Sequence, residues 1–216
     1  MQSLRRLVDP ELLDAVVISH MHPDHVLDLV PLRYLLSLPP AKRKSKLDVY
    51  VHPGAPALLR RLASCVPSRQ GEHFFDRAMN VCEYDPRVPL QIGDLQIRFV
   101  RTHHYIEAYA IRVSDGQRSI AYSADTAPSP AVVDLARDAD LFLCEASLGV
   151  DGIEGGERGH SNAREAGEMA RKANAKHLVL THYGAEFDQD ALRDAALGEF
   201  DGPVSVADDG LEFVLP

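Results

Sequence analysis

Short apolar runs separated by turn residues alternate along the chain between the period of a strand and the period of a helix. Strands are predicted at residues 15–18, 48–51, 141–145 and 177–181. Helices are predicted at residues 27–38, 55–65, 130–137, 162–173 and 190–197, with a shorter one at 72–79. Residues 95–102, 108–113 and 119–124 predict consecutive antiparallel strands. This alternation predicts an α/β (α+β) fold.

The helix predicted at residues 162–173 has a clear start signal. Asn162 followed three residues later by Glu165 resembles a capping box. A face of alanine and glycine residues along the same helix predicts close packing against a sheet. His160 therefore lies just before a helix N-terminus, where backbone N–H groups and the helix dipole favour an anion.

Composition narrows the class of protein. The chain has 216 residues, of which 45% are apolar and 25% charged, and we expect one domain over residues 1–216. No run approaches the roughly 20 apolar residues that cross a bilayer, so we expect no membrane partner and a cytoplasmic protein. A net charge of −9 argues against a broadly basic surface for long nucleic acids.

Cys65, Cys82 and Cys144 form no C-x-x-C pair and are expected to be reduced, mostly buried thiols.

The strongest chemical signal directly follows the strand predicted at residues 15–18. His20, His22, Asp24 and His25 lie within six consecutive positions. Two histidines two apart in an extended loop can converge on one cation, while the Asp-His pair can hold a second cation nearby. The alternative is a surface histidine cluster without a preorganised site. Further candidate ligands at the ends of other predicted strands argue against that alternative.

On these segments the chain resembles the metallo-β-lactamase-fold hydrolases, in the branch of ribonuclease Z and related phosphodiesterases. The H-x-H-x-D-H loop is shared by the whole superfamily. The branch is indicated by the segments THHYIEAYAIRV, IAYSADTAPS and GHSNAREAGEMARKANAKHLVLTHY. The resemblance runs from about Asp14 to His182. It implies a four-layer αββα sandwich.

The resemblance also implies a set of metal ligands. The first metal would be held by His20, His22 and His104, the second by Asp24, His25 and His182, and Asp125 would bridge both. His104 is preferred because the family pattern places the ligand five residues before an aromatic residue, here Tyr109. His103 remains the alternative.

Two residues are expected to act in catalysis. His160 resembles the family histidine beside the scissile phosphate, with helix capping as its structural alternative. Asp24 could accept the proton of the attacking water in addition to binding metal. Glu145 could orient a ligand histidine.

The implied reaction is hydrolysis by a hydroxide shared between two divalent cations, most simply zinc, although manganese or iron would suit the same ligands. The first expected substrate is a small phosphodiester, a cyclic nucleotide among the candidates. Cleavage of tRNA at its 3′ end is second, because relatives insert a substrate-gripping arm where only 20 residues separate His104 from Asp125 here. RNA binding would therefore proceed without that arm. Two further alternatives are a lactone or carboxylic-ester hydrolase and an inactive metal-binding scaffold.

The start of the chain departs from the family pattern. Relatives have a strand hairpin before the histidine motif, whereas about 14 residues precede the first strand here. We expect an N-terminally short form with an open sheet edge. Homodimerisation is expected from the relatives.

Overall fold

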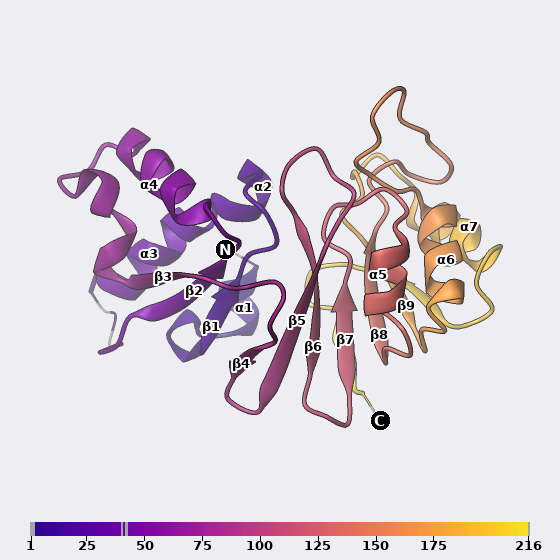
Figure 1. The fold of residues 1–216 in the computed structure, drawn as a ribbon, viewed down its shortest axis with the longest axis horizontal. Helices are drawn as coiled ribbons and strands as arrows, with labels where there is room; N and C mark the ends of the chain where they lie inside the picture. The colour runs from indigo at the N-terminus through magenta and orange to yellow at the C-terminus, as the bar shows by residue number, and fades with distance from the viewer. Residues whose placement is uncertain (1–2, 40, 42, 216) are drawn as a thin grey trace. The chain divides into compact units, whose positions relative to one another are not determined.

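The structure is a computed structural model that describes residues 3–39, 41 and 43–215. Its helices and strands alternate, which confirms the mixed α/β class (Figure 1). Contacts divide the chain into two compact units, one ending at Asp85 and the other beginning at Pro86. That residues 1–216 form one metallo-β-lactamase-fold domain stays a prediction, and each unit is described by itself below.

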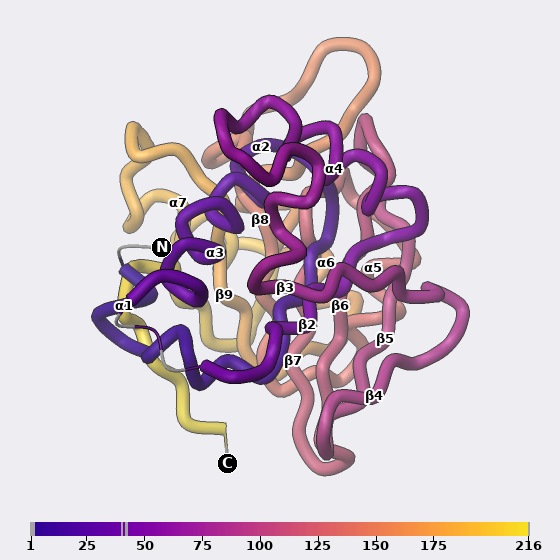
Figure 2. Tube along the Cα trace, turned by 90° about the vertical axis from the view of Figure 1, so that its left-hand side faces the viewer, coloured from indigo at the N-terminus to yellow at the C-terminus, as the bar shows by residue number. Residues whose placement is uncertain are grey.

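The first unit is a parallel sheet with helices packed on it. Its strands β1 (Ala15–Val17), β2 (Leu47–Val51) and β3 (Met79–Glu83) lie in that order. Helices α3 (Leu29–Ser37) and α4 (Ala55–Cys65) bury apolar side chains against the sheet in one core cluster. Figure 2 follows this part of the trace from α3 through α4 to β3.

Helix α4 begins and ends as the sequence predicts, and α3 begins two residues later than expected. The histidine motif is not wholly a loop, because Pro23–Val26 forms the short helix α2. Pro23 stands in its first turn, where a missing N–H costs nothing.

The helix predicted at residues 72–79 is wrong. Two 3-10 turns, η2 (Gly71–His73) and η3 (Phe75–Arg77), occupy most of that segment, and Met79 already belongs to β3. Phe74 and Phe75 are both buried in the core. The carbonyl of Phe74 accepts the Arg33 Nε–H at 2.9 Å, so a tertiary contact replaces the helical hydrogen bond.

The second unit is a seven-stranded mixed sheet. Its order is β10-β9-β8-β7-β6-β5-β4, antiparallel from β4 to β7 and parallel from β7 to β10. The strands are β4 (Leu90–Ile92), β5 (Leu95–Arg101), β6 (Tyr109–Ser114), β7 (Ser119–Tyr122), β8 (Leu141–Glu145), β9 (Leu178–Thr181) and β10 (Val204–Val206). The antiparallel strands β5, β6 and β7 are confirmed, whereas β3, β4 and β10 were not predicted.

Helices α5 (Pro130–Leu135), α6 (Ala163–Lys172) and α7 (Gln189–Leu197) share one core cluster with the strands of this sheet (Figure 1). The capping box of α6 is confirmed: the Asn162 side chain accepts the Glu165 N–H, and the Glu165 carboxylate accepts the Asn162 N–H. A Cβ at Gly167 would lie 2.5 Å from the carbonyl oxygen of Ala196. The small-residue face of α6 therefore packs closely on α7 as well as on the sheet.

The described residues before β1 form α1 (Leu4–Leu7) and the 3-10 turn η1 (Pro10–Leu12), with no strand among residues 3–14. Among the described residues, no helix has the length and apolar character needed to cross a membrane. Cys144 is buried, but Cys65 is exposed and Cys82 intermediate, so the expectation of mostly buried thiols is wrong.

Candidate metal centre

The first unit carries four candidate ligands in the segment after β1. The Oγ of Ser19 lies 3.0 Å from Nδ1 of His20 and orients that ring. The rings of His20 and His22 meet edge to face with centroids 4.9 Å apart, and His20 and His25 centroids are 4.0 Å apart. His25 Nε2 is 3.2 Å from Asp24 Oδ2. The sequence motif therefore folds into one tight cluster of imidazoles with a carboxylate at its edge.

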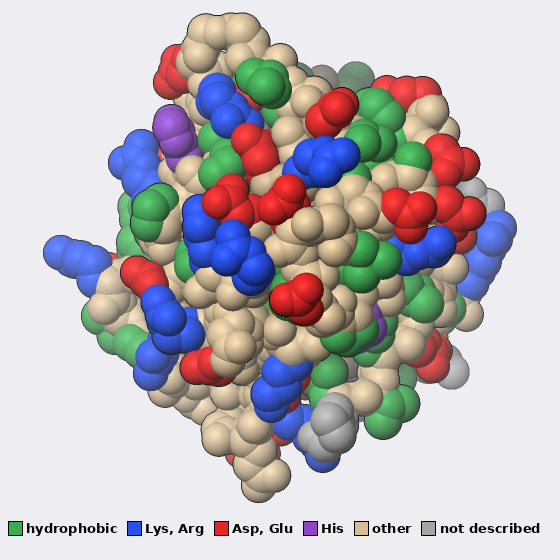
Figure 3. Space-filling view, turned by 90° about the vertical axis from the view of Figure 1, so that its right-hand side faces the viewer, with side chains coloured by type: hydrophobic (Ala, Val, Ile, Leu, Met, Phe, Trp, Pro, Cys, Tyr) green, Lys and Arg blue, Asp and Glu red, His purple; other side chains and the backbone are tan. Residues whose placement is uncertain are grey.

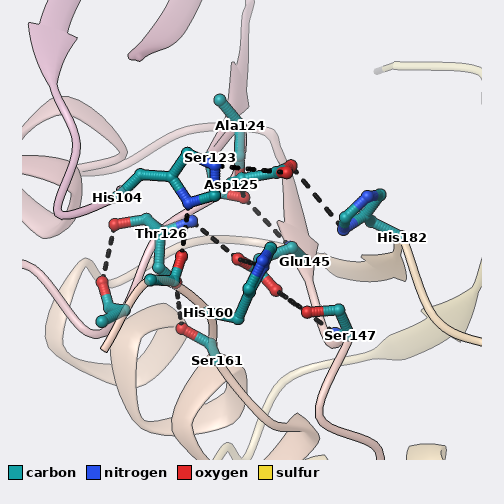
Figure 4. Close-up of polar contacts among 12 residues, drawn as sticks. His104, Ser123, Ala124, Asp125, Thr126, Glu145, Ser147, His160, Ser161 and His182 are labelled. Atoms are coloured by element: carbon teal, nitrogen blue, oxygen red, sulfur yellow. Dashed lines mark hydrogen bonds and ion pairs between the residues drawn. The ribbon is translucent and has the colours of Figure 1, made fainter. Parts of the chain in front are cut away.

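The second unit carries a carboxylate between two imidazoles, at the end of β7. Asp125 Oδ2 lies 3.8 Å from His104 Nε2, and Asp125 Oδ1 lies 3.6 Å from His182 Nδ1 (Figure 4). Each oxygen of one buried carboxylate thus faces a different histidine. This is the arrangement of a carboxylate that can contribute one oxygen to each of two cations.

The spacing of these atoms fits metal ligation. Separations of 3.6 and 3.8 Å are too long for good hydrogen bonds. Two ligand atoms on one tetrahedral zinc, each about 2.0–2.1 Å from the metal, lie about 3.4 Å apart. Asp125, His160 and His182 each offer an atom within 4.8 Å of the other two. Imidazole nitrogen and carboxylate oxygen are donors that suit zinc and related divalent cations.

The ring of His104 is held in one tautomer. Its Nδ1 lies 2.8 Å from the carbonyl oxygen of Gly159, which can only accept a hydrogen bond. Nδ1 therefore carries the proton, and the lone pair is on Nε2, the atom that faces Asp125.

His160 is anchored by a buried carboxylate. Its Nδ1 lies 3.0 Å from Oε1 of Glu145, a residue with no exposed surface. That hydrogen bond raises the pKa of His160 above its ordinary value. Burial of the ring acts to lower the pKa, but its effect is smaller. The rings of His160 and His182 stack with centroids 5.8 Å apart. Glu145 therefore orients His160, which is outside the predicted ligand set, and its role in orienting a ligand histidine stays a prediction.

Hydrogen bonds of Thr126 join the strand ends that carry the site. Its N–H donates to Glu145 Oε1 at 2.6 Å, and its Oγ1 accepts the N–H of His103 at 3.2 Å. Its carbonyl accepts the hydroxyl of Ser161 at 2.6 Å (Figure 4). Ser147 donates to the other oxygen of Glu145 at 2.7 Å. Sequence reasoning assigned no role to Thr126, although the motif IAYSADTAPS contains it.

Two further polar residues were missed because no motif marks them. Tyr105 donates its hydroxyl to Glu154, in the segment between β8 and α6, and this bond raises the pKa of Tyr105 to about 12. Burial acts to raise the pKa of Glu154, but this bond and two backbone N–H groups outweigh it and lower that pKa.

Sequence comparison identifies relatives along most of the chain. Residues 1–183 match the family described as "Beta-lactamase superfamily domain". The "Probable metallo-hydrolase YhfI" of Bacillus subtilis is 32% identical over 205 residues, which cover 94% of this chain and 79% of that protein. A "Ribonuclease Z" of Myxococcus xanthus is 45% identical over 102 residues, 46% of this chain and 33% of that protein.

Solved structures agree with the sequence matches. The crystal structure of the metallo-beta-lactamase fold protein YhfI from Bacillus subtilis gives a TM-score of 0.82 at 30% identity, over 96% of this chain and 80% of that one. A diphosphatase of the PhnP family gives a TM-score of 0.74 at 22% identity, over 99% of this chain and 76% of that one. The second likeness concerns the fold alone.

Proposed function

The chain belongs to the β-lactamase superfamily and has the metallo-β-lactamase fold of metallo-hydrolases, and we propose that it hydrolyses phosphodiester bonds with two bound divalent cations. The observation that carries the choice of bond is His160, anchored by Glu145 and within 4.8 Å of the ligand atoms of Asp125 and His182. A histidine placed in this way can stabilise the negative charge that develops on a phosphoryl oxygen.

The proposed metal ligands are those that the family resemblance implies. One cation is assigned to His20, His22 and His104, the other to Asp24, His25 and His182, and both to Asp125. Support comes from the two oxygens of Asp125, which face His104 and His182 separately. His104 is preferred to His103 because its Nε2 faces Asp125, whereas His103 is an exposed residue. Zinc is the proposed metal, on the chemistry of the donors.

Divalent cations held by these residues would lower the pKa of a water molecule towards neutrality and offset charge on the substrate. Asp24, whose side chain is 62% exposed, can accept the proton that this water releases. Because Nδ1 of His160 is hydrogen-bonded to Glu145, Nε2 is the ring atom that would contact the substrate oxygen. His160 then stabilises charge on that oxygen or protonates the leaving group.

A small substrate is proposed because the described residues include no segment that resembles a grip for tRNA. Residues 105–124, between His104 and Asp125, are a four-residue loop, β6, a four-residue turn, β7 and two further residues, so this segment holds no protruding arm. A cavity of about 820 Å³ beside His182 is lined by acidic side chains, among them Asp188 and Asp208. An acidic wall disfavours a long polyanion. Figure 3 shows acidic side chains intermingled with basic ones over the face that it presents.

The second candidate is cleavage of RNA. It is favoured by the local identity of 45% with the ribonuclease Z of Myxococcus xanthus. A labelled precursor tRNA, offered to the zinc-loaded protein, tests it directly. Specific cleavage at the 3′ end at submicromolar protein would favour this candidate over the small diester.

Hydrolysis of bis(p-nitrophenyl) phosphate and of a simple lactone by the zinc-loaded protein tests the proposed bond. We expect turnover of the diester, and His160→Ala to lower its kcat by roughly 10²–10³-fold. The matched control is His73→Ala, since His73 is an exposed histidine paired with Asp76 at 2.8 Å. Lactone hydrolysis that is faster than diester hydrolysis and indifferent to His160→Ala would replace the proposal with a carboxylic-ester hydrolase.

A further inference from the structure

The segment 151–159, between β8 and α6, is closed on itself by one carboxylate. Glu154 Oε2 accepts the backbone N–H of Gly159 at 2.7 Å and that of His160 at 3.0 Å. Its Oε1 accepts the hydroxyl of Tyr105, from the segment between β5 and β6. Three donors thus converge on a side chain that is only partly exposed.

The peptide that Glu154 holds is linked to two functional histidines of this unit, His104 and His160. Gly159 donates its N–H to Glu154 and accepts the Nδ1–H of His104 on its carbonyl at 2.8 Å. The next residue, His160, also donates its N–H to Glu154, while its ring is bonded to Glu145. A shift of this peptide would therefore move the acceptor of His104 and the backbone of His160 together.

Close packing leaves this peptide little freedom on its other side. A Cβ at Gly159 would lie 2.5 Å from the ring of Tyr105, so a larger residue there would have to displace that ring. Arg158 next to it donates to both carboxylate oxygens of Glu165, at 2.9 and 2.8 Å, and so ties the segment to the first turn of α6. The glycine-rich sequence of residues 152–159 has high backbone freedom of its own, which these contacts must restrict.

We propose that Glu154 is a positioning residue of the metal centre. It fixes the peptide between Gly159 and His160, and through the Gly159 carbonyl it fixes the ring of His104. Hydrogen-bond partners behind a metal-ligating histidine set its tautomer and orientation. This role rests on the metal ligation proposed for His104, but the orientation of the His104 ring can be observed in the metal-free protein.

The first test follows the His104 ring by NMR in the metal-free protein. In the wild type, the Nδ1–H of His104 should give a resonance protected from exchange with water, because it donates to Gly159. Glu154→Ala should remove that protection. Glu154→Asp retains the charge but is one methylene shorter, so it should behave as the alanine variant does. Glu154→Gln can offer its oxygen to the two N–H groups and its amide to Tyr105, and should restore protection.

The second test measures the dissociation constant for zinc in competition with a chromophoric chelator. Glu154→Ala and Glu154→Asp should weaken binding roughly 10–100-fold, as loss of a supporting contact behind a ligand does elsewhere. Glu154→Gln should bind as the wild type does. The matched control is Glu157→Ala, an exposed glutamate of the same segment, which should leave both readouts unchanged.

The proposal is overturned if Glu154→Ala retains both the protected resonance and the zinc affinity of Glu157→Ala. It is also overturned if Glu154→Asp retains the protected resonance and the zinc affinity, because the length of the Glu154 side chain would then not matter. Should Glu154→Ala fail to fold, the aspartate variant decides. A wild-type protein that binds zinc but hydrolyses no ester would refute the proposed function while leaving these two readouts to judge Glu154.

Discussion

Ala124 and His182, at the candidate metal centre, have left-handed backbone conformations. Their φ angles are 51° and 53°. A residue with a Cβ in this region costs roughly 1–2 kcal/mol relative to right-handed backbone. Ala124 precedes Asp125, and His182 is itself a proposed ligand. Strain of this kind is typical of sites where the surrounding structure imposes a geometry.

Replacing Ala124 with glycine should relieve that strain. The free energy of unfolding should rise by about 0.5–1 kcal/mol, because glycine enters left-handed backbone freely but also loses more entropy on folding. Urea denaturation of the metal-free variant and wild type measures the difference. An unchanged or lower midpoint would mean that φ at residue 124 is not strained in solution.

Single residues whose type and spacing carry the chemistry could be predicted from the sequence. His20, Asp125 and His182 each stand in a motif after a predicted strand. The partners behind them follow from tertiary structure. Glu154 meets Gly159 and His160 only because the intervening segment folds back, and nothing in the spacing of those residues predicts that return.

The contact between α6 and α7 is set by one glycine. A Cβ at Gly167 would lie 2.5 Å from the carbonyl oxygen of Ala196, which belongs to the backbone of α7 and cannot move alone. Gly167→Ala should therefore destabilise the protein by about 1–3 kcal/mol, even though alanine favours a helix.

Thermal unfolding of Gly167→Ala against Gly155→Ala measures that cost. A Cβ at Gly155 would meet open space, and its φ lies outside the left-handed region, so this control should unfold close to the wild type. Equal melting temperatures for the two variants would show that α7 can shift away without loss.

Asp140, the residue before β8, links the start of β7 to the connection between α6 and β9. Its Oδ2 accepts the Ser119 N–H at 2.7 Å, and its Oδ1 accepts from Lys176 Nζ at 2.7 Å. The Lys176 bond is the main cause of a lowered Asp140 pKa, aided by the Ser119 N–H and opposed by burial. A carboxyl with a lowered folded-state pKa adds stability above its unfolded pKa of about 3.9. That stability is lost as the pH falls through the folded value.

Asp140→Asn should thus be less stable than the wild type at pH 7, and the gap should close as the pH falls below about 4. Chemical denaturation between pH 7 and pH 3 measures both free energies of unfolding. A gap that stays constant over this range would contradict a charged role for Asp140.

Elements with a regular period and a clear end signal could be predicted from the sequence, and others could not. Helix α4 and strand β8 match their predicted bounds, since each is bounded by turn residues. The prediction of a helix at residues 72–79 is wrong because Phe74 and Phe75 are buried, and their core contacts replace helical hydrogen bonds. Strand β10, three residues long, is too short for its period to be recognised.

Charge differs between the two units of the molecule. Residues 1–85 carry 11 Lys and Arg against 10 Asp and Glu, whereas residues 86–216 carry 12 against 22. The net charges are therefore +1 and −10, which together give the −9 of the whole chain. The unit that holds Asp125, His160 and His182 is the acidic one. A small diester carries one negative charge and is repelled less by this acidic unit than a long nucleic acid, which carries many.

Two metals bridged by Asp125 are proposed to perform the hydrolysis, and metal content measured together with activity tests this proposal. Elemental analysis of the wild type should find about two zinc ions per chain together with turnover of bis(p-nitrophenyl) phosphate. Asp125→Ala should lose bound zinc and turnover together, because both of its oxygens are assigned to metal. A wild type without bound metal, or an Asp125→Ala variant with unchanged metal and activity, would refute a metal-bridging role for Asp125.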